Sequence, residues 1–164
     1  MHERDLKGAY NLLVNCGQAC EGERLLLCYE QKNLDFYDNA IVEDVWACAQ
    51  EIGLEVIPYE LDFDPVIDVV PKHLEAAIAA ADLTVFLARL ADQMRFGRFK
   101  SGQRTILSYA LNSASLASPF GTVHYKASLA LKQVIDAAVF GAGEVVVSCK
   151  AGTYFKGRIA ASPD

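Results

Sequence analysis

The sequence lacks any long hydrophobic run, which argues against a membrane-spanning helix. Such a helix needs roughly 20 consecutive apolar residues, and no stretch of this chain approaches that length. The first seven residues are mostly polar or charged and lead into no apolar segment, so we expect no signal peptide. These two absences predict a cytoplasmic protein that has no membrane partner.

Positive charge is also scarce. The chain has 15 Lys and Arg residues against 21 Asp and Glu residues, which gives a formal net charge of −6. An acidic chain repels phosphate backbones, so we expect no nucleic-acid partner. The local exception is the segment 95–104, where four cations alternate with Phe96 and Phe99. Arginine forks there could hold an anionic group, and the aromatic residues suit single-stranded nucleic acid, but we favour a solvated face.

Histidines are too few and too scattered to form a metal site. His2, His73 and His124 lie on three different predicted helices, and none is within ligand spacing of another. The five cysteines are an odd number, and four of them lie inside apolar segments, so we expect reduced thiols. The chain also lacks the P-loop, G-x-S-x-G, H-E-x-x-H and C-x-x-C motifs. We therefore predict no catalytic residue and no metal ligand in this chain.

The apolar residues that are present follow two alternating patterns. Helical spacing predicts helices at about residues 3–19, 39–52, 71–81, 91–99 and 123–140. Short apolar runs predict strands at residues 24–29, 54–59, 83–88, 105–110 and 144–149, with 153–159 as a candidate extension. This order predicts a single three-layer, Rossmann-like α/β domain over residues 1–164. Its sheet would be mostly parallel, with about five strands and with helices on both faces.

Loops that follow the predicted strands carry the candidate ligand-facing residues. Asp62 and Asp64 could hold a divalent ion between phosphates, as in sugar transferases, although Pro65 makes a simple turn equally natural. The small-residue loop 112–121 follows the fourth predicted strand, at the edge where parallel sheets bind ligands. The full set of candidates is Asp62, Asp64, Arg95, Arg98, Asn112 and Ser113.

Three segments taken together resemble the N-terminal domain of the aminopeptidase T family of metal-dependent peptidases. Residues 13–27 contain a helix end, the sequence Gly-Glu-Arg and an apolar strand. Residues 80–85 contain Ala-Asp before a strand, and residues 145–153 contain a valine strand and then Gly-Thr. The order and spacing agree along essentially the whole chain. The same N-terminal half is also found in the related ring-cleaving dihydroxypyridine dioxygenases.

The resemblance implies a half-enzyme that is not catalytic by itself. The metal ligands of that family belong to a C-terminal half, so none can be assigned to a residue here. It implies no cofactor in this chain, a divalent metal in a full-length parent, and a missing C-terminal catalytic domain as partner; a homodimer is a further candidate. The role implied is to shape substrate access and to support assembly. From the residues alone, a self-contained small-ligand or nucleotide-binding protein remains the alternative, with Asp62 and Asp64 serving a transferase.

Overall fold

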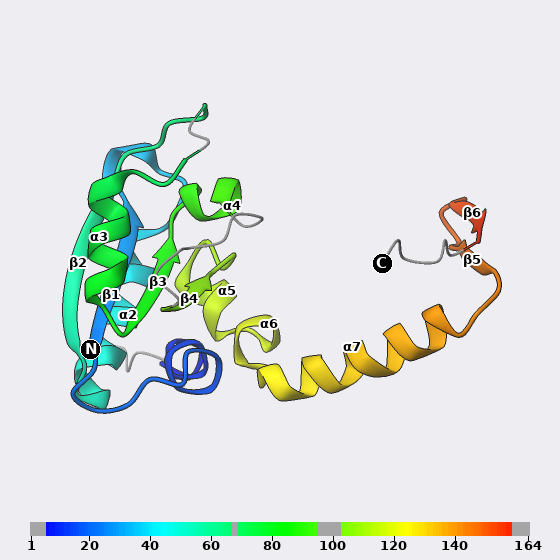
Figure 1. Cartoon of the computed structure of the whole chain (residues 1–164), viewed down its shortest axis with the longest axis horizontal. Coiled ribbons are helices and arrows are strands. Elements are labelled where there is room, and N and C mark those ends of the chain that lie inside the picture. The colour runs from blue at the N-terminus through cyan, green and yellow to red at the C-terminus, as the bar shows by residue number, and fades with distance from the viewer. Residues whose placement is uncertain (1–5, 67–68, 95–102, 159–164) are drawn as a thin grey trace. The chain divides into compact units, whose positions relative to one another are not determined.

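A computed structural model describes residues 6–66, 69–94 and 103–158 of the chain (Figure 1). The chain divides into two compact units, Met1–His124 and Tyr125–Asp164, which are called unit 1 and unit 2 and are described separately. No helix within the described ranges combines the length and the apolar content that a membrane span requires.

Unit 1 is built on a parallel sheet of four strands. The strands are β1 (Arg24–Glu30), β2 (Glu55–Leu61), β3 (Leu83–Leu87) and β4 (Arg104–Leu107), and their order in the sheet is β2-β1-β3-β4. In the centre, Leu25 of β1 is in register with Val56 on one side and with Leu83 on the other. The predicted Rossmann-like α/β class is confirmed, with four strands in the sheet where about five were expected.

The helices of unit 1 connect and cover these strands. They are α1 (Lys7–Tyr10), α2 (Asn39–Ile52), α3 (Lys72–Ala80), α4 (Leu90–Met94), α5 (Ser113–Ala117) and α6 (Pro119–Thr122), with a π-helix η1 (Asn11–Cys16) and a 3-10 helix η2 (Lys32–Leu34). Helix α2 has the bounds that the sequence predicts, because Asp38 accepts a hydrogen bond from the backbone of Ala40 and Gly53 ends the helix at φ 86°. The predicted helix 91–99 is described only as far as Met94.

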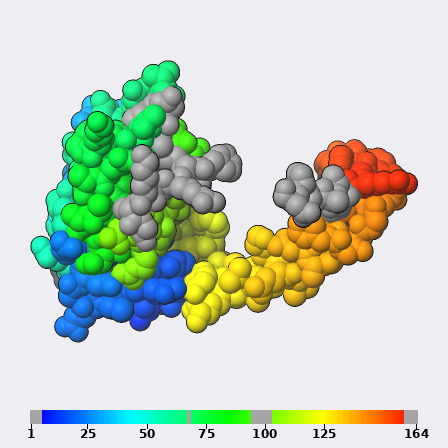
Figure 2. Space-filling view, in the orientation of Figure 1, coloured from blue at the N-terminus to red at the C-terminus, as the bar shows by residue number. Residues whose placement is uncertain are grey.

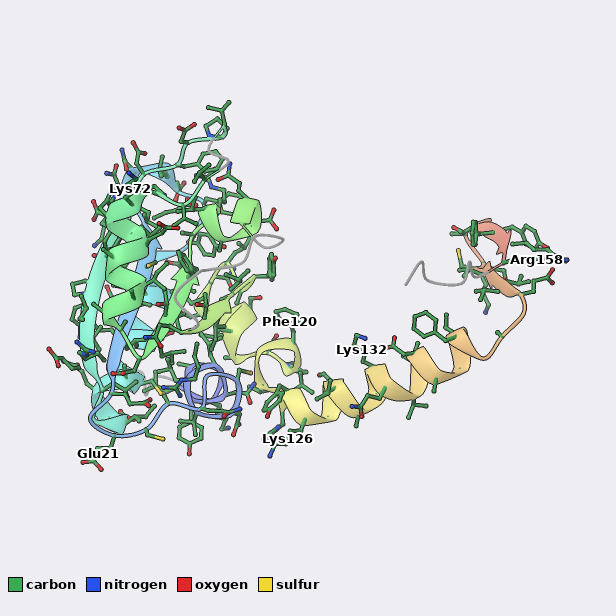
Figure 3. All side chains as sticks on the ribbon, viewed as in Figure 1. Glu21, Lys72, Phe120, Lys126, Lys132 and Arg158 are labelled. Carbon is green, nitrogen blue, oxygen red and sulfur yellow. The ribbon has the colours of Figure 1, made fainter. Side chains whose placement is uncertain are left out.

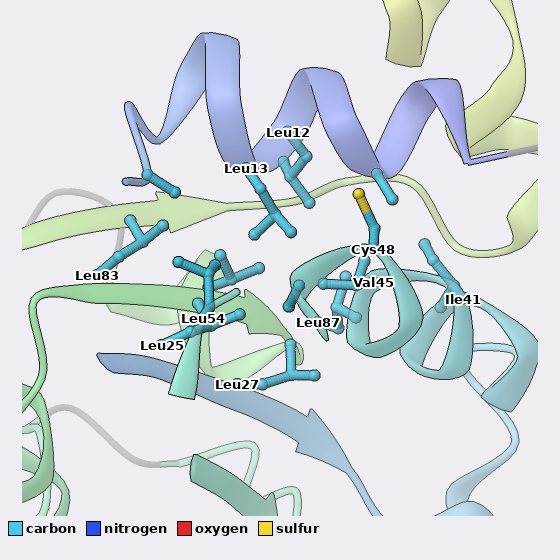
Figure 4. Packing of buried hydrophobic residues seen from close by; sticks show 14 of the residues in the cluster. Leu12, Leu13, Leu25, Leu27, Ile41, Val45, Cys48, Leu54, Leu83 and Leu87 are labelled. Atoms are coloured by element: carbon cyan, nitrogen blue, oxygen red, sulfur yellow. The ribbon is translucent and has the colours of Figure 1, made fainter. Parts of the chain in front are cut away.

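Alternating side chains of the strands send apolar residues to both faces of the sheet. Leu25 and Leu27 of β1 pack in one cluster with Leu13 of η1 and Val45 of α2 (Figure 4). Leu26 and Cys28, their neighbours in the same strand, pack in a second cluster with Leu74 and Ile78 of α3, among others. Helices therefore cover both faces of the sheet, and β1 and β3 read as unbroken apolar runs because they are buried on both sides.

Unit 2 consists of α7 (Tyr125–Phe140) and an antiparallel pair of strands, β5 (Val145–Ser148) and β6 (Tyr154–Gly157). The prediction that β5 is a buried strand of the parallel sheet is wrong, since β5 pairs with β6 in a separate sheet and Val146 is 52% exposed. The reason is local. Gly152, at φ 95°, closes a turn in which its backbone N–H donates to the carbonyl of Cys149, so two short strands pair across a few residues.

Candidate functional site

The carboxyl edge of the four-stranded sheet contains a topological switch point between β1 and β3. Helix α2 connects β1 to β2 over one face of the sheet, and α3 connects β2 to β3 over the other face. The two connections leave the carboxyl ends of β1 and β3 side by side, and open α/β sheets bind their ligands in the crevice outside such a point. Glu30 is the last residue of β1, and Arg89 comes two residues after the end of β3.

Glu30 and Arg89 form a bidentate ion pair at this switch point. Nε of Arg89 donates to both carboxylate oxygens of Glu30 at 3.0 Å, and Nη2 donates to Oε2 at 2.8 Å. The backbone N–H of Arg89 donates to Oε1 as well. Only 3% of the Glu30 side chain and 24% of the Arg89 side chain are exposed. The carboxylate is thus buried and fully committed to one residue, which fixes where the guanidinium lies.

Two phenylalanine rings contact the guanidinium of Arg89. Its Cζ atom lies 4.4 Å from the ring centre of Phe36 and 3.7 Å from that of Phe63, within the range of cation–π attraction. Phe36 belongs to the loop after β1 and Phe63 to the loop after β2. Arg89 therefore links the loops that follow three neighbouring strands.

A pocket of about 280 Å³ opens beside Arg89 and is lined by Phe36, Tyr37, Tyr109 and Leu111, among others. The hydroxyl of Tyr37 donates to the carbonyl of Ser108 at 3.2 Å, and the hydroxyl of Tyr109 donates to Asp92 at 3.3 Å. Burial, and then the charge of Glu30, raise the pKa of Tyr37 to about 12. Its hydroxyl therefore stays neutral at physiological pH, and the pocket combines apolar walls with a few fixed polar groups.

Asp62 and Asp64 line a second cleft, of about 400 Å³, together with Tyr59 and His73. Both aspartates are exposed, and each accepts a hydrogen bond from a nearby backbone N–H, from Phe63 at 2.8 Å and from Val66 at 2.9 Å. Within the described part of the chain, no group of three or more His, Cys, Asp or Glu residues is arranged to hold a metal ion. The local hydrogen bonds are those of a turn.

The remaining sequence candidates lie elsewhere. Arg95 and Arg98 fall outside the described residues. The Asn112 side chain caps α5 by accepting a hydrogen bond from the backbone of Ser115 at 2.7 Å, and Ser113 is the first residue of that helix, with a hydroxyl oxygen that is buried. Both positions are explained by the helix start, and their role toward a ligand stays a prediction.

Asn11 holds the end of the segment 112–123 against η1, the π-helix to which Asn11 belongs. Its side-chain amide donates to the carbonyls of Gly121 and Val123, both at 2.9 Å. The segment 112–121, which the sequence predicted as a binding loop, thus contributes to two short helices, and Leu111, the residue before it, lines the pocket beside Arg89.

Sequence reasoning missed Glu30, Arg89, Phe36 and Phe63. The sequence did contain a signal that could have located them. One buried strand ends on a charged residue, and a second buried strand has a charged residue two positions after its end. Glu30 closes the run Leu25–Tyr29, and Arg89 follows Leu83–Ala88. In a parallel sheet such residues lie on the ligand-binding edge, but their pairing depends on β1 and β3 being neighbours, which the chain order alone does not give.

Comparison with known proteins gives a fold likeness and no family. No protein-family model and no curated protein sequence matches the chain. Among solved structures, it is similar to 2,5-dihydroxypyridine dioxygenase from Pseudomonas putida KT2440, with 16% identity and a TM-score of 0.50. That likeness covers 94% of this chain and 47% of the dioxygenase, so the chain spans about half of its length.

Two weaker likenesses are to VinN in complex with L-aspartate and to a fatty acid ABC transporter substrate-binding protein from Thermomonospora curvata. VinN has 17% identity and a TM-score of 0.43, over 68% of this chain and 28% of VinN. The transporter protein has 22% identity and a TM-score of 0.41, over 72% of this chain and 31% of that protein. At these identities the likenesses concern the fold alone.

The resemblance to aminopeptidase T is wrong. The similar structures are a dihydroxypyridine dioxygenase, VinN, a transporter-binding protein and an enoyl reductase domain, and none is an aminopeptidase T. The motifs that suggested it have local structural causes. Gly22 adopts φ 84° in the turn before β1, Asp82 accepts a hydrogen bond from the backbone of Arg24 at 2.8 Å, and Gly152 closes the turn between β5 and β6. Such turn residues recur wherever a helix or loop leads into a strand.

Proposed function

We propose that the chain is a non-catalytic recognition module that binds a small planar molecule beside Arg89 and forms part of a larger enzyme. The observation that carries the proposal is the Glu30–Arg89 pair at the switch point, with Phe36 and Phe63 against the guanidinium. A buried carboxylate that fixes an arginine next to a pocket provides a prearranged hydrogen-bond donor at the edge where such sheets bind ligands.

The pocket favours one ring with a hydrogen-bond acceptor. Nε–H and one N–H of Nη2 donate to Glu30, so the two N–H groups of Nη1 and the second N–H of Nη2 are the donors that a ligand would engage. A volume of about 280 Å³ is at the small end for ligand pockets, which suits a single aromatic or heteroaromatic ring. Phe36 and Tyr109 supply ring faces for stacking. A carboxylate, carbonyl or hydroxyl on the ring would accept from Arg89.

The proposal that this chain is one part of a larger enzyme is supported by the structural likeness to the dioxygenase, because this chain spans only 47% of the dioxygenase. The reacting groups, including a divalent metal, would come from a second, catalytic part, and this module would shape access to it. We place the assembly in the cytoplasm, because none of the five cysteines forms a disulfide, as expected in a reducing compartment.

Calorimetric titration with benzoate and with its neutral analogue benzamide tests the proposal. The double variant Glu30→Met with Arg89→Met removes the donor without leaving a buried charge unpaired. Its matched control is Glu23→Met with Arg104→Met, since Arg104 pairs with Glu23 at 2.6 Å at the opposite, amino edge of the sheet. We expect saturable binding, roughly millimolar or tighter for a fragment of this size, in the wild type and the control only. Absence of binding to the wild type, or equal binding to both double variants, would contradict the proposal.

The second candidate is a self-contained nucleotide-binding protein that uses Asp62 and Asp64. The cleft of about 400 Å³ that both aspartates line is the observation in its favour. It predicts that magnesium with ADP raises the melting temperature of the wild type and leaves that of Asp62→Asn with Asp64→Asn unchanged, whereas the Arg89 proposal predicts no shift in either.

A further inference from the structure

Helix α7 has an apolar stripe that requires a cover. All sixteen of its residues are described and none is buried; Leu131 is 62%, Val134 68% and Ile135 50% exposed. On the face that Figure 2 shows, the atoms of α7, yellow to orange, form a narrow column, and the atoms of β5 and β6, orange to red, lie at its carboxyl end. A helix of this length is marginal in water by itself, and so is a lone two-stranded hairpin. The folded form of unit 2 therefore needs a partner surface.

The stripe has the spacing of a coiled-coil seam. Ala127, Leu131, Val134 and Ala138 recur at intervals of four, three and four residues, which is the alternation of the two core positions in a heptad. Ala130 and Ile135 widen the stripe at its two edges. A helix of the same kind can insert its side chains between these residues.

The stripe is self-complementary about one point, midway between Leu131 and Val134. Two antiparallel helices related by a two-fold axis at that point place the following pairs opposite each other: Leu131 with Val134, Ile135 with Ala130, and Ala127 with Ala138. The larger side chains thus meet medium or small ones, and two alanines meet at each end, where the helices can approach closely. A self-complementary patch of this kind is what a two-fold symmetric dimer requires.

Charges agree with the antiparallel arrangement. Helix α7 has no acidic residue in its first turn and no basic residue in its last turn, so its own side chains do not offset the partial charges at its ends. In the antiparallel pair, each positive amino end lies beside the negative carboxyl end of the other copy. Lys132, which Figure 3 labels, forms an ion pair with Asp136, and both residues lie outside the stripe.

We infer that α7 is a homodimerisation helix that packs antiparallel against α7 of a second copy of this chain, with Leu131 against Val134. Two helices of about four turns form an interface at the low end of the specific range. The dimer therefore dissociates on dilution.

Sedimentation velocity of the full chain over a range of concentrations tests this inference. We expect a reversible monomer–dimer equilibrium for the wild type. Leu131→Glu places a charge in the seam and should weaken dimerisation at least about tenfold. The matched control is Leu129→Glu, the same change on the side of α7 away from the stripe, at a leucine that is 46% exposed. The control should dimerise like the wild type.

A mixing experiment tests the register. Leu131→Glu and Val134→Lys should each be monomeric alone, but an equal mixture places the introduced carboxylate of one copy opposite the introduced ammonium group of the other. The same mixed pair keeps the native contact between Val134 and Leu131 on its second side, so we expect the mixture to dimerise. A wild type that stays monomeric at every concentration, a control as weak as Leu131→Glu, or a mixture without dimer would each overturn the inference. Because neither residue belongs to the core of unit 1, the melting of unit 1 should be unchanged in all variants.

Discussion

Arg89 shows how one side chain can organise an edge of a sheet. It forms an ion pair with a buried carboxylate and contacts two phenylalanine rings from separate loops. Burying two charges costs several kcal/mol per ion before their attraction is counted. Such a pair adds little to stability compared with an apolar replacement, and its contribution is the fixed position of the guanidinium.

Because Glu30 and Arg89 form a buried ion pair, the effects of their substitutions on the free energy of unfolding should not be additive. Arg89→Met leaves Glu30 buried without its counterion and should lower the free energy of unfolding by about 3–5 kcal/mol. The double variant Glu30→Met with Arg89→Met should be close to the wild type, because no buried charge remains. Urea unfolding followed by circular dichroism measures both. A double variant as unstable as the single one would show that the pair, rather than its imbalance, stabilises the fold.

Cysteine reactivity provides a second residue-scale prediction. Hydrogen bonds, first of all from the side chain of Thr153, lower the pKa of the exposed Cys149 thiol. Burial raises the pKa of Cys28 and raises that of Cys48 to about 11. Since the thiolate is the reacting form, iodoacetamide at pH 8 should alkylate Cys149 well before Cys48 and Cys28, as read by peptide mass spectrometry. Thr153→Val should slow Cys149 alone, and an unchanged rate would refute the role of that hydrogen bond.

At the scale of elements, the sequence predicted those parts of the fold that local chemistry determines. The bounds of α2 follow from Asp38 and Gly53, which act within a few residues of each helix end. The unusual form of the first helix did not follow, because η1 is associated with contacts between Asn11 and carbonyls more than a hundred residues away. The placement of β5 also failed, since an apolar strand pattern does not reveal whether its partner is a distant edge or the next few residues.

The hydrogen bonds of Asn11 in η1 predict how much stability is lost when its side chain is removed. Asn11→Ala removes the two hydrogen bonds that Asn11 donates to the carbonyls of Gly121 and Val123, and also the one that it accepts from Asn15. It should lower the free energy of unfolding by about 1–3 kcal/mol. Asn15→Ala is the matched control, because Asn15 donates one hydrogen bond, to Asn11 itself, and should cost less. Chemical denaturation of the two variants side by side decides the order; an equal or reversed order would show that Asn11 does not anchor the segment.

At the scale of the whole molecule, both core clusters lie within unit 1, because their members span Ala9 to Leu116. A chain that ends at His124 should therefore keep the sheet, and its thermal unfolding should remain cooperative. Differential scanning calorimetry of this shortened chain beside the full chain makes the test. Loss of the cooperative transition would mean that unit 1 needs residues 125–164 in order to fold.

The candidate site could be located only in part from the sequence. The rule that parallel sheets bind ligands at their carboxyl edge directed attention to the loops after the strands, where the candidate site also lies. It selected Asp62 and Asp64 because acidic loops are conspicuous in a sequence. It passed over Glu30 and Arg89, which are 59 residues apart and meet only because the chain crosses over β1 after β2 and places β3 on the other side of β1. Strand order, which depends on packing between distant segments, was the missing information.

The most direct test of the proposed function is an NMR titration of the full, isotope-labelled chain with benzoate, followed at the Nε–H resonance of Arg89. We expect this resonance and the backbone amides of Tyr37 and Tyr109 to shift together and to saturate, because all three residues line one pocket. Shifts confined to Asp62, Asp64 and their neighbours, or no saturable shift at all, would contradict the proposed function.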